Sequence, residues 1–241
     1  MIYKRFLFGV VLCLLCFSAG NVVAQETYSE AILIGKGTPD LHGEGIGLQK
    51  EAYDAFLKMR AAAKKEGIEI KVVSGYRNFN RQKAIFERKY KRYTADGLSP
   101  EAAIDKIVEY STIPGTSRHH WGTDIDIIDN AAGINKNVLD PDKFVGNGPF
   151  CELREWLEEH ANSFGFYIVY TDAPDRKGFK YEPWHYSYAP ISKPMLRAYK
   201  KLDVKSILVG EQLLGSEHLS SEFMEAYIKN NILDINPELK D

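Results

Sequence analysis

The chain has 241 residues, of which 44% are hydrophobic, and it carries 31 Lys and Arg against 33 Asp and Glu. This length suits one domain with a substantial core and excludes a small scaffold that depends on several disulfides. The slightly acidic balance excludes a nucleic-acid-binding surface, which needs an excess of basic residues.

The first 24 residues have the pattern of a secretory signal peptide. Lys4 and Arg5 form a basic start, an apolar run extends from Phe6 to Phe17, and small residues from Val22 to Ala24 precede the expected cleavage site. The apolar run is too short to span a bilayer comfortably. We therefore expect an exported protein, periplasmic or extracellular, without stable membrane insertion after cleavage.

Cleavage after Ala24 leaves 217 residues and removes Cys13 and Cys16. Lipidation of Cys16 is disfavoured because Leu15 is larger than the residue that lipoprotein processing usually tolerates. Cys151 alone cannot form an internal disulfide. The mature chain must therefore be stabilised by its own core, with a bound metal as a further source of stability.

The first half of the mature chain predicts three helices and one strand. Residues 25–46 are rich in glycine and polar residues and are expected to form an extended leading segment. Apolar residues recur at helical spacing from Leu48 to Lys65, and β-branched alternation from Ile68 to Val73 predicts a strand. Helices are expected from Asn80 to Tyr93 and from Ser99 to Tyr110, the second with a serine cap and a proline in its first turn.

The second half predicts short strands and a helix between them. Alternation predicts strands from Asp124 to Ile128 and from Phe166 to Tyr170, and an extended aromatic run predicts another strand or strand end from Tyr181 to Tyr188. A helix is expected from Cys151 to Asn162, and a helical tail begins near Ser192. Helices that flank a few short, mostly antiparallel strands indicate the α+β class.

These elements divide the chain into a signal peptide (1–24), the leading segment (25–46), a catalytic domain (47–190) and a helical C-terminal extension (191–241). Apolar residues of the extension recur at helical spacing. They predict packing against the catalytic domain, with partner binding or coverage of a cleft as the alternatives.

Two histidines and an aspartate form a candidate metal site. His119 lies in a loop flanked by proline and glycine, Asp126 follows seven positions later in a predicted strand, and His185 comes from a distant segment. Imidazole and carboxylate both suit zinc, and a catalytic zinc site has three protein ligands and an open position for water. His120 and Asp124 are rival ligands that spacing alone does not separate from their neighbours. Four of the six histidines, His120 among them, are interpreted as packed or surface residues; the other three are His42, His160 and His218.

Glu182 is a candidate general base beside this site. It lies three residues before His185, with Pro183 between them. On a regular strand the side chains of Glu182 and His185 would point to opposite faces. A bend at the proline is therefore needed to bring them together.

Arg77 ends a Ser-Gly-Tyr-Arg turn that directly follows the first predicted strand, a position where functional residues are common. Its guanidinium could stabilise a negatively charged tetrahedral intermediate or bind a terminal carboxylate. Ser117 and Gln82 are weaker candidates for substrate binding, Ser117 beside the histidine loop and Gln82 on the following helix.

Three motifs together resemble the LAS metallopeptidases, and in particular their VanY-type D-alanyl-D-alanine carboxypeptidases. The motifs are Ser74-Gly75-Tyr76-Arg77, Ser117-x-His119-x-x-Gly122-x-x-x-Asp126 and Glu182-x-x-His185. The similarity covers residues 45–190. It selects His119 over His120 and Asp126 over Asp124, although the family usually has a small residue, often Ala, at the position of Asp124.

The resemblance implies a LAS or hedgehog-like peptidase fold with one Zn²⁺ on His119, Asp126 and His185 and with Glu182 as general base. It implies a secreted enzyme that removes the terminal D-Ala from peptidoglycan stem peptides. The alternatives are an L,D-carboxypeptidase or peptidoglycan endopeptidase with the same site, and a zinc-containing binding module such as a hedgehog signalling domain. Glu182 disfavours the binding module, because binding alone needs no general base. The sequence sets neither the oligomeric state nor the length of the substrate.

Overall fold

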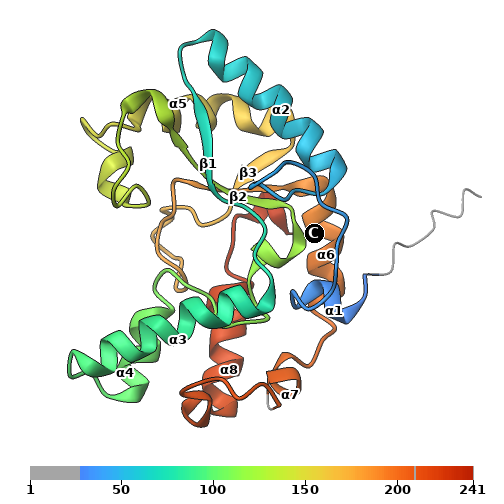
Figure 1. The fold of residues 1–241 in the computed structure, drawn as a ribbon, viewed down its shortest axis with the longest axis vertical. Helices are drawn as coiled ribbons and strands as arrows, with labels where there is room; N and C mark the ends of the chain where they lie inside the picture. Colours follow the sequence, from blue (N-terminus) through green and yellow to red (C-terminus); the bar gives the residue numbers. More distant parts are fainter. Residues whose placement is uncertain (1–27, 209, 241) are drawn as a thin grey trace, which may run out of the picture.

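The computed structural model describes residues 28–208 and 210–240, and Figure 1 shows their arrangement. The expected signal peptide, residues 1–24, lies outside this range. Among the helices of the described residues, none is both long enough and apolar enough to cross a membrane.

The described residues form a four-stranded sheet that lies between two groups of helices. Its strands are β1 (Ile70–Ser74), β2 (Asp124–Asp129), β3 (Phe166–Ile168) and β4 (His185–Tyr188). Their order is β1-β2-β4-β3, and each neighbouring pair is antiparallel. The predicted α+β class with a small antiparallel sheet is confirmed.

The register between β2 and β4 sorts their side chains onto two faces of the sheet. The paired residues are Asp124 with Ser187, Ile125 with Tyr186, and Asp126 with His185. Because side chains alternate along a strand, Ile125 and Tyr186 share one face, where they belong to a hydrophobic core. The four polar side chains share the other face and are also buried.

Two helices pack on the apolar face of the sheet. They are α2 (Lys50–Lys65) and α5 (Cys151–His160), in the upper part of Figure 1. The core between these elements includes Phe56, Met59, Ile125, Ile127, Leu153 and Trp156. Full burial of one large apolar side chain contributes about 1.5–3 kcal/mol relative to exposure, so this layer fixes the position of the sheet.

A second group of helices shares a separate core. These helices are α3 (Phe79–Ala95), α4 (Pro100–Ile107), α6 (Ala189–Tyr199), α7 (Val204–Leu208) and α8 (Ser221–Tyr227). Phe86 and Ile104, which precede most of the sheet in sequence, pack in one cluster with Met195, Met224 and Tyr227 from the C-terminal part of the chain. The C-terminal extension is therefore built onto α3 and α4, as the lower part of Figure 1 shows.

The leading segment differs from the extended form that its composition predicts. It contains α1 (Glu30–Leu33), in which the side chain of Ser29 accepts a hydrogen bond from the backbone N–H of Ile32 and Leu33 is buried. A capped first turn with a buried apolar residue explains the helix. The other short elements are the 3₁₀ turns η1 (Arg118–Trp121), η2 (Asn130–Ala132), η3 (Pro141–Phe144), η4 (Ala161–Phe164), η5 (Ser216–His218) and η7 (Pro237–Leu239), and the π-helical turn η6 (Ile228–Ile232).

Of the strand or strand end predicted from Tyr181 to Tyr188, only the second half is a strand, because β4 begins at His185. Pro183 has no N–H for a strand ladder, and the chain turns there. The backbone N–H of His185 donates to the carbonyl of Glu182 at 3.1 Å. This turn is the bend that the pair of Glu182 and His185 requires.

Other boundaries differ by a few residues. The helix expected from Ser99 ends at Ile107, although Ser99 caps it as predicted by accepting from the N–H of Ala102. The helix expected to reach Asn162 ends at His160 and continues as η4. The strand expected to reach Tyr170 ends at Ile168. Such differences are normal at the ends of elements.

Candidate metal centre

A tight loop holds His119 in front of the sheet. His119 lies in η1, and Gly122 ends this turn with φ of 66°, in the left-handed region that favours glycine. A Cβ atom on Gly122 would lie 2.6 Å from Cδ2 of Leu41. The chain therefore reverses sharply after Trp121 and enters β2, which returns Asp126 to the side of His119.

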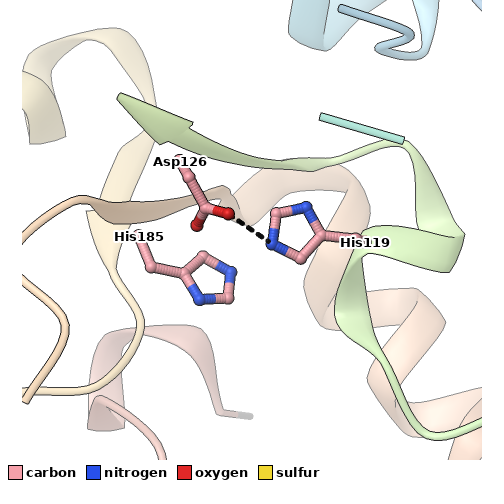
Figure 2. Close-up of side chains that lie close together, drawn as sticks. All are labelled: His119, Asp126 and His185. Carbon is pink, nitrogen blue, oxygen red and sulfur yellow. Dashed lines mark ion pairs between the residues drawn. The ribbon is translucent and has the colours of Figure 1, made fainter. Parts of the chain in front are cut away.

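The structure brings His119, Asp126 and His185 together, and Figure 2 shows their side chains converging. Their ligand atoms lie within 4.8 Å of one another, and all three residues are buried. Nε2 of His119 is 3.5 Å from Oδ2 of Asp126, and the ring centroids of His119 and His185 are 4.7 Å apart. Since Asp126 and His185 are paired across β2 and β4, the register of the sheet sets their separation.

The protonation of His119 suits a metal ligand. Its Nδ1 atom lies 2.8 Å from the carbonyl oxygen of Gly75. A carbonyl only accepts, so Nδ1 carries the proton and Nε2 offers its lone pair on the side of Asp126. Burial and the positive charge of Arg77 lower the pKa of His119, which favours the neutral form that binds metals.

Asp126 supplies the negative charge of the cluster. Burial alone opposes its ionisation, but the neighbouring His119, His185 and Arg77 outweigh burial and lower the pKa of Asp126. Two imidazoles and one carboxylate at this separation match the donor set of a catalytic zinc site. The side chains present therefore fit a zinc ion.

His185 has a different environment from His119. Burial disfavours its charged form, but hydrogen bonds with Asp124 and Glu182 prevail and raise the pKa of His185 to about 9. A metal ligand must be deprotonated at the binding nitrogen, so metal binding is expected to release a proton from this residue.

The two rival ligands occupy other positions. Nδ1 of His120 donates to the carbonyl of Arg77 at 2.5 Å, and its Nε2 accepts from the N–H of Gly115 at 3.1 Å. Both nitrogens of His120 are thus engaged in holding the loop. Asp124 forms a buried ion pair with Arg118, with 2.9 Å between Nε and Oδ2. Neither rival belongs to the converging group.

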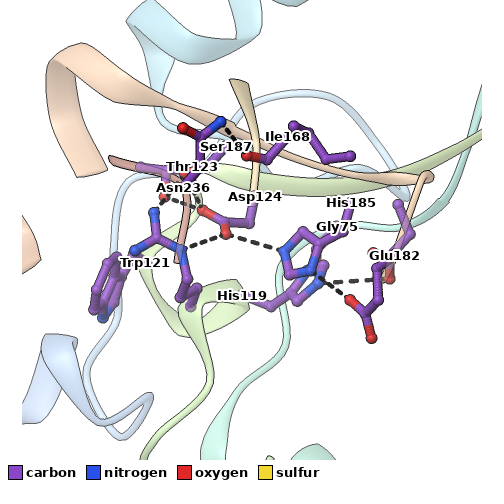
Figure 3. A network of polar contacts seen from close by, with 12 residues as sticks. Gly75, His119, Trp121, Thr123, Asp124, Ile168, Glu182, His185, Ser187 and Asn236 are labelled. Atoms are coloured by element: carbon purple, nitrogen blue, oxygen red, sulfur yellow. Dashed lines mark hydrogen bonds and ion pairs between the residues drawn. The ribbon is translucent and has the colours of Figure 1, made fainter. Parts of the chain in front are cut away.

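Glu182 lies directly beside the cluster, as Figure 3 shows. Its Oε2 atom is 2.9 Å from Nδ1 of His185, and the residue is buried. Burial raises the pKa of Glu182 in spite of the neighbouring His185. A raised pKa brings a carboxylate closer to the range in which it can accept a proton and return it.

Arg77 is held by Gln82. Nη1 of Arg77 donates to Oε1 of Gln82 at 3.0 Å, and Nε2 of Gln82 donates to the carbonyl of Thr112 at 2.7 Å. Gln82 is fully buried and both ends of its amide are engaged. The structure therefore places Gln82 behind Arg77, and not in the position of a substrate contact that the sequence predicts.

A cavity of about 550 Å³ opens onto the cluster, a size typical of small-molecule sites. Its wall includes the predicted site residues other than Gln82, which are Arg77, Ser117, His119, Asp126, Glu182 and His185. Trp184 also lines the cavity, whereas Trp121 is buried elsewhere and donates its indole N–H to the carbonyl of Leu33. Of the two tryptophans beside the motifs, only Trp184 walls the site.

The motifs do not identify several other residues of the cavity wall, including Lys89, Tyr110, Asn137, Asp140 and Tyr170. Lys89 lies seven residues after Gln82 on α3, so helical spacing alone places the two on one face. Burial lowers the pKa of Lys89, while Glu182 opposes this effect. Asn137 and Asp140 come from a loop in which the sequence gives no comparable signal.

Comparison with known sequences supports the resemblance stated above. The sequence model of the family described as VanY, D-alanyl-D-alanine carboxypeptidase, matches residues 45–191. A D-alanyl-D-alanine carboxypeptidase of Enterococcus faecalis (strain ATCC 700802 / V583) is 35% identical over 153 residues, which are 62% of this chain and 50% of the relative. A protein of Bacillus subtilis (strain 168), provisionally named carboxypeptidase YodJ, is 35% identical over 142 residues, 58% of this chain and 46% of the relative. The chain thus spans about half the length of these two curated relatives.

Solved structures share the fold. VanYB in complex with D-alanine-D-alanine has a TM-score of 0.53 and 26% identity, covering 72% of this chain and 90% of that chain. A variant of the vancomycin-resistance D,D-pentapeptidase VanY in complex with Zn(II) has a TM-score of 0.51 and 26% identity, covering 71% and 90%. The predicted peptidase fold is confirmed. With a family match over more than half of its length, the chain belongs to the VanY D-alanyl-D-alanine carboxypeptidase family.

Proposed function

We propose that this protein is a zinc-dependent D-alanyl-D-alanine carboxypeptidase that hydrolyses the terminal D-Ala of peptidoglycan stem peptides. The observation that carries the proposal is the convergence of His119, Asp126 and His185 beside a buried Glu182 in one cavity. Membership of the VanY family supports the reaction class. The solved relatives in complex with D-alanine-D-alanine and with Zn(II) support the substrate and the metal.

His119, Asp126 and His185 would hold the zinc ion. When bound, zinc lowers the pKa of a water molecule to about 7 and polarises the scissile carbonyl. With two neutral imidazoles and one carboxylate as ligands, the cluster does not neutralise a divalent cation. The site therefore keeps the net positive charge that a developing oxyanion needs.

Glu182 is the proton carrier in this proposal. It accepts the proton of the attacking water and returns it to the amine of the departing D-Ala. Its burial and raised pKa support both steps, because a strongly acidic carboxylate would bind the proton too weakly. Before zinc binds, its contact with Nδ1 of His185 places the carboxylate next to the ligand cluster.

Arg77 supplies a fixed positive charge in the same cavity. Gln82 orients the guanidinium through Nη1, and the buried Nε atom has no hydrogen-bond partner within the described part of the chain. Because Arg77 lines the cavity, its guanidinium can serve the carbonyl oxygen that becomes negative or the terminal carboxylate of the peptide. Ser117, on the cavity wall, is proposed as a further substrate contact.

The proposed substrate places the protein in the cell envelope. Peptidoglycan lies outside the cytoplasmic membrane, and the pattern of residues 1–24 predicts export. We therefore propose that the protein acts in the periplasm or outside the cell.

Mass spectrometry of a synthetic stem pentapeptide ending in D-Ala-D-Ala tests the proposal. Incubation with the zinc-loaded protein should release one alanine, and a chelator should abolish the release until zinc is restored. A tetrapeptide and a cross-linked peptide in parallel reactions test the L,D-carboxypeptidase and endopeptidase alternatives. If all three substrates survive a protein that has bound zinc, the peptidase proposal is overturned and a binding module is favoured.

A further inference from the structure

A second carboxylate contacts His185 at its other ring nitrogen. Oδ2 of Asp124 is 3.1 Å from Nε2 of His185, while Glu182 contacts Nδ1 (Figure 3). Asp124 is fully buried, and strand pairing places it on the same face of the sheet as His185. The backbone therefore fixes this contact, which does not depend on a mobile surface side chain.

Donors on both oxygens hold Asp124 in place. Nε of Arg118 donates to Oδ2 at 2.9 Å, and the hydroxyls of Thr123 and Ser187 donate to Oδ1, both at 2.7 Å. Nη2 of Arg118 also donates to Ser187 at 2.7 Å. Both oxygens of Asp124 therefore face donors, and Arg118 supplies the opposite charge of a buried ion pair. Asp124 is thus a fixed, charged acceptor.

We propose that Asp124 is a positioning residue that fixes the orientation and tautomer of His185 as a metal ligand. The inference rests on the proposed zinc site. A carboxylate only accepts, so the ring nitrogens of His185 carry protons toward Asp124 at Nε2 and toward Glu182 at Nδ1, and metal binding would remove the proton on Nδ1 while Asp124 keeps the one on Nε2. The carbonyl of Gly75 fixes the tautomer of His119 in a similar way, but it accepts from Nδ1 and so leaves the lone pair on Nε2. Each imidazole thus has one nitrogen held by an acceptor outside the ligand cluster, and the other nitrogen would bind the metal, which for His185 means that Nδ1 exchanges its contact with Glu182 for the metal.

Two simpler roles for Asp124 explain less. The group of converging ligand atoms comprises His119, Asp126 and His185, so Asp124 is not placed as a further ligand. A role limited to balancing the charge of Arg118 leaves the contact with His185 unexplained.

Asp124→Asn tests the proposal with little change in size. Its amide can present an N–H to Nε2 of His185, which favours the wrong tautomer. We expect zinc binding, measured by competition with a chromophoric chelator, to weaken by about ten- to a hundredfold. The visible absorption spectrum of the Co(II)-substituted protein should also change, since it reports the geometry of the ligands. Thr123→Val is the matched control, because it removes one hydrogen bond to Asp124 but leaves the carboxylate against His185, and it should bind zinc like the wild type.

A double variant separates positioning from charge balance. Asp124→Asn combined with Arg118→Met removes both members of the ion pair, and thermal unfolding verifies that it folds. If Asp124 positions His185, the double variant binds zinc as weakly as Asp124→Asn alone. Recovery of wild-type zinc affinity and Co(II) spectrum in the double variant overturns the inference, as does unchanged affinity in Asp124→Asn. A wild-type protein that binds no zinc contradicts the proposed function itself, so the two failures are distinguishable.

Discussion

The hydroxyl of Tyr227 lies 2.7 Å from the hydroxyl of Thr116, within a buried contact between α8 and the loop that carries His119. Tyr227 Oη also accepts the backbone N–H of Ile113 at 3.1 Å. Tyr199, from α6, donates to the carbonyl of Gly115 in the same loop at 3.0 Å. The C-terminal extension, beyond the segment matched to the family, thus supports one side of the candidate metal centre.

Tyr227→Phe should destabilise the protein by about 1–3 kcal/mol, because the buried N–H of Ile113 loses its acceptor. Urea unfolding of the chelated protein measures the effect without a contribution from zinc. Tyr167→Phe is the control, since Tyr167 is only partly buried against the same core. Equal losses in the two variants would show that the hydroxyl of Tyr227 has no special role.

Gly75→Ala should destabilise the protein and weaken zinc binding together. A Cβ atom on Gly75 would lie 1.8 Å from the carbonyl oxygen of Ile46, so the backbone must move, at a cost of about 1–3 kcal/mol. The carbonyl of Gly75 holds the ring of His119, which would move with it. Gly210→Ala is the matched control, because among the described residues other than its chain neighbours no atom lies within 4 Å of the added Cβ. Normal zinc affinity in a destabilised Gly75→Ala variant would contradict the link between this carbonyl and the ligand.

The central strand shows what periodicity predicts well. Alternating residues from Asp124 to Ile128 predict a strand with two unlike faces, and the structure has Ile125 and Ile127 in the core and the aspartates on the site face. The motifs also contain the residues that converge. The strand and the motifs both depend on short-range patterns, which a single sequence displays directly.

The parts that the sequence does not predict depend on contacts between distant residues. Tyr227 and Thr116 are 111 residues apart, and no local pattern links them. The pairing of Asp124 with Arg118 and His185 requires the register of β2 and β4, which alternation alone leaves open. Gln82 follows the turn of Arg77 closely in sequence, which predicts a position near the cleft. Only the packing of α3 shows that it lies behind Arg77.

Arg77→Lys should reduce kcat/KM by about 10²–10³-fold while zinc binding stays unchanged. Lysine keeps the charge but lacks the planar fork of the guanidinium, which can donate to Gln82 and to the substrate from separate, fixed N–H groups. Steady-state kinetics on the pentapeptide measure the effect. Arg81→Lys, at an exposed position of α3, the helix that follows Arg77, should leave kcat/KM unchanged. A normal kcat/KM in Arg77→Lys would remove Arg77 from the proposed mechanism.

Glu182→Gln should lower kcat by about 10²–10⁴-fold, because the amide cannot accept the proton of the attacking water. Zinc should still bind, since His119, Asp126 and His185 are intact. Single-turnover assays and zinc titration of the same sample separate these effects. Glu159→Gln, at an exposed position, serves as the control. Retention of full activity in Glu182→Gln would exclude it as the general base.

His120 should make the metal-free protein sensitive to acid. Burial lowers the pKa of His120 to about 3, although its hydrogen bond with the carbonyl of Arg77 opposes the shift. In the unfolded chain its pKa is about 6.5. Between these values the unfolded chain binds a proton that the folded chain does not, so stability falls as the pH falls.

The expected loss from this residue is about 2 kcal/mol between pH 6.5 and pH 5. Urea unfolding of the chelated wild type and of His120→Gln across this range measures it. His120→Gln should be less stable at pH 7, because it loses well-placed hydrogen bonds, but its stability should depend less on pH. The remaining ionisable groups are shared by both proteins, so the difference between the two pH profiles isolates His120. Parallel profiles would mean that His120 binds a proton equally well in the folded and unfolded states.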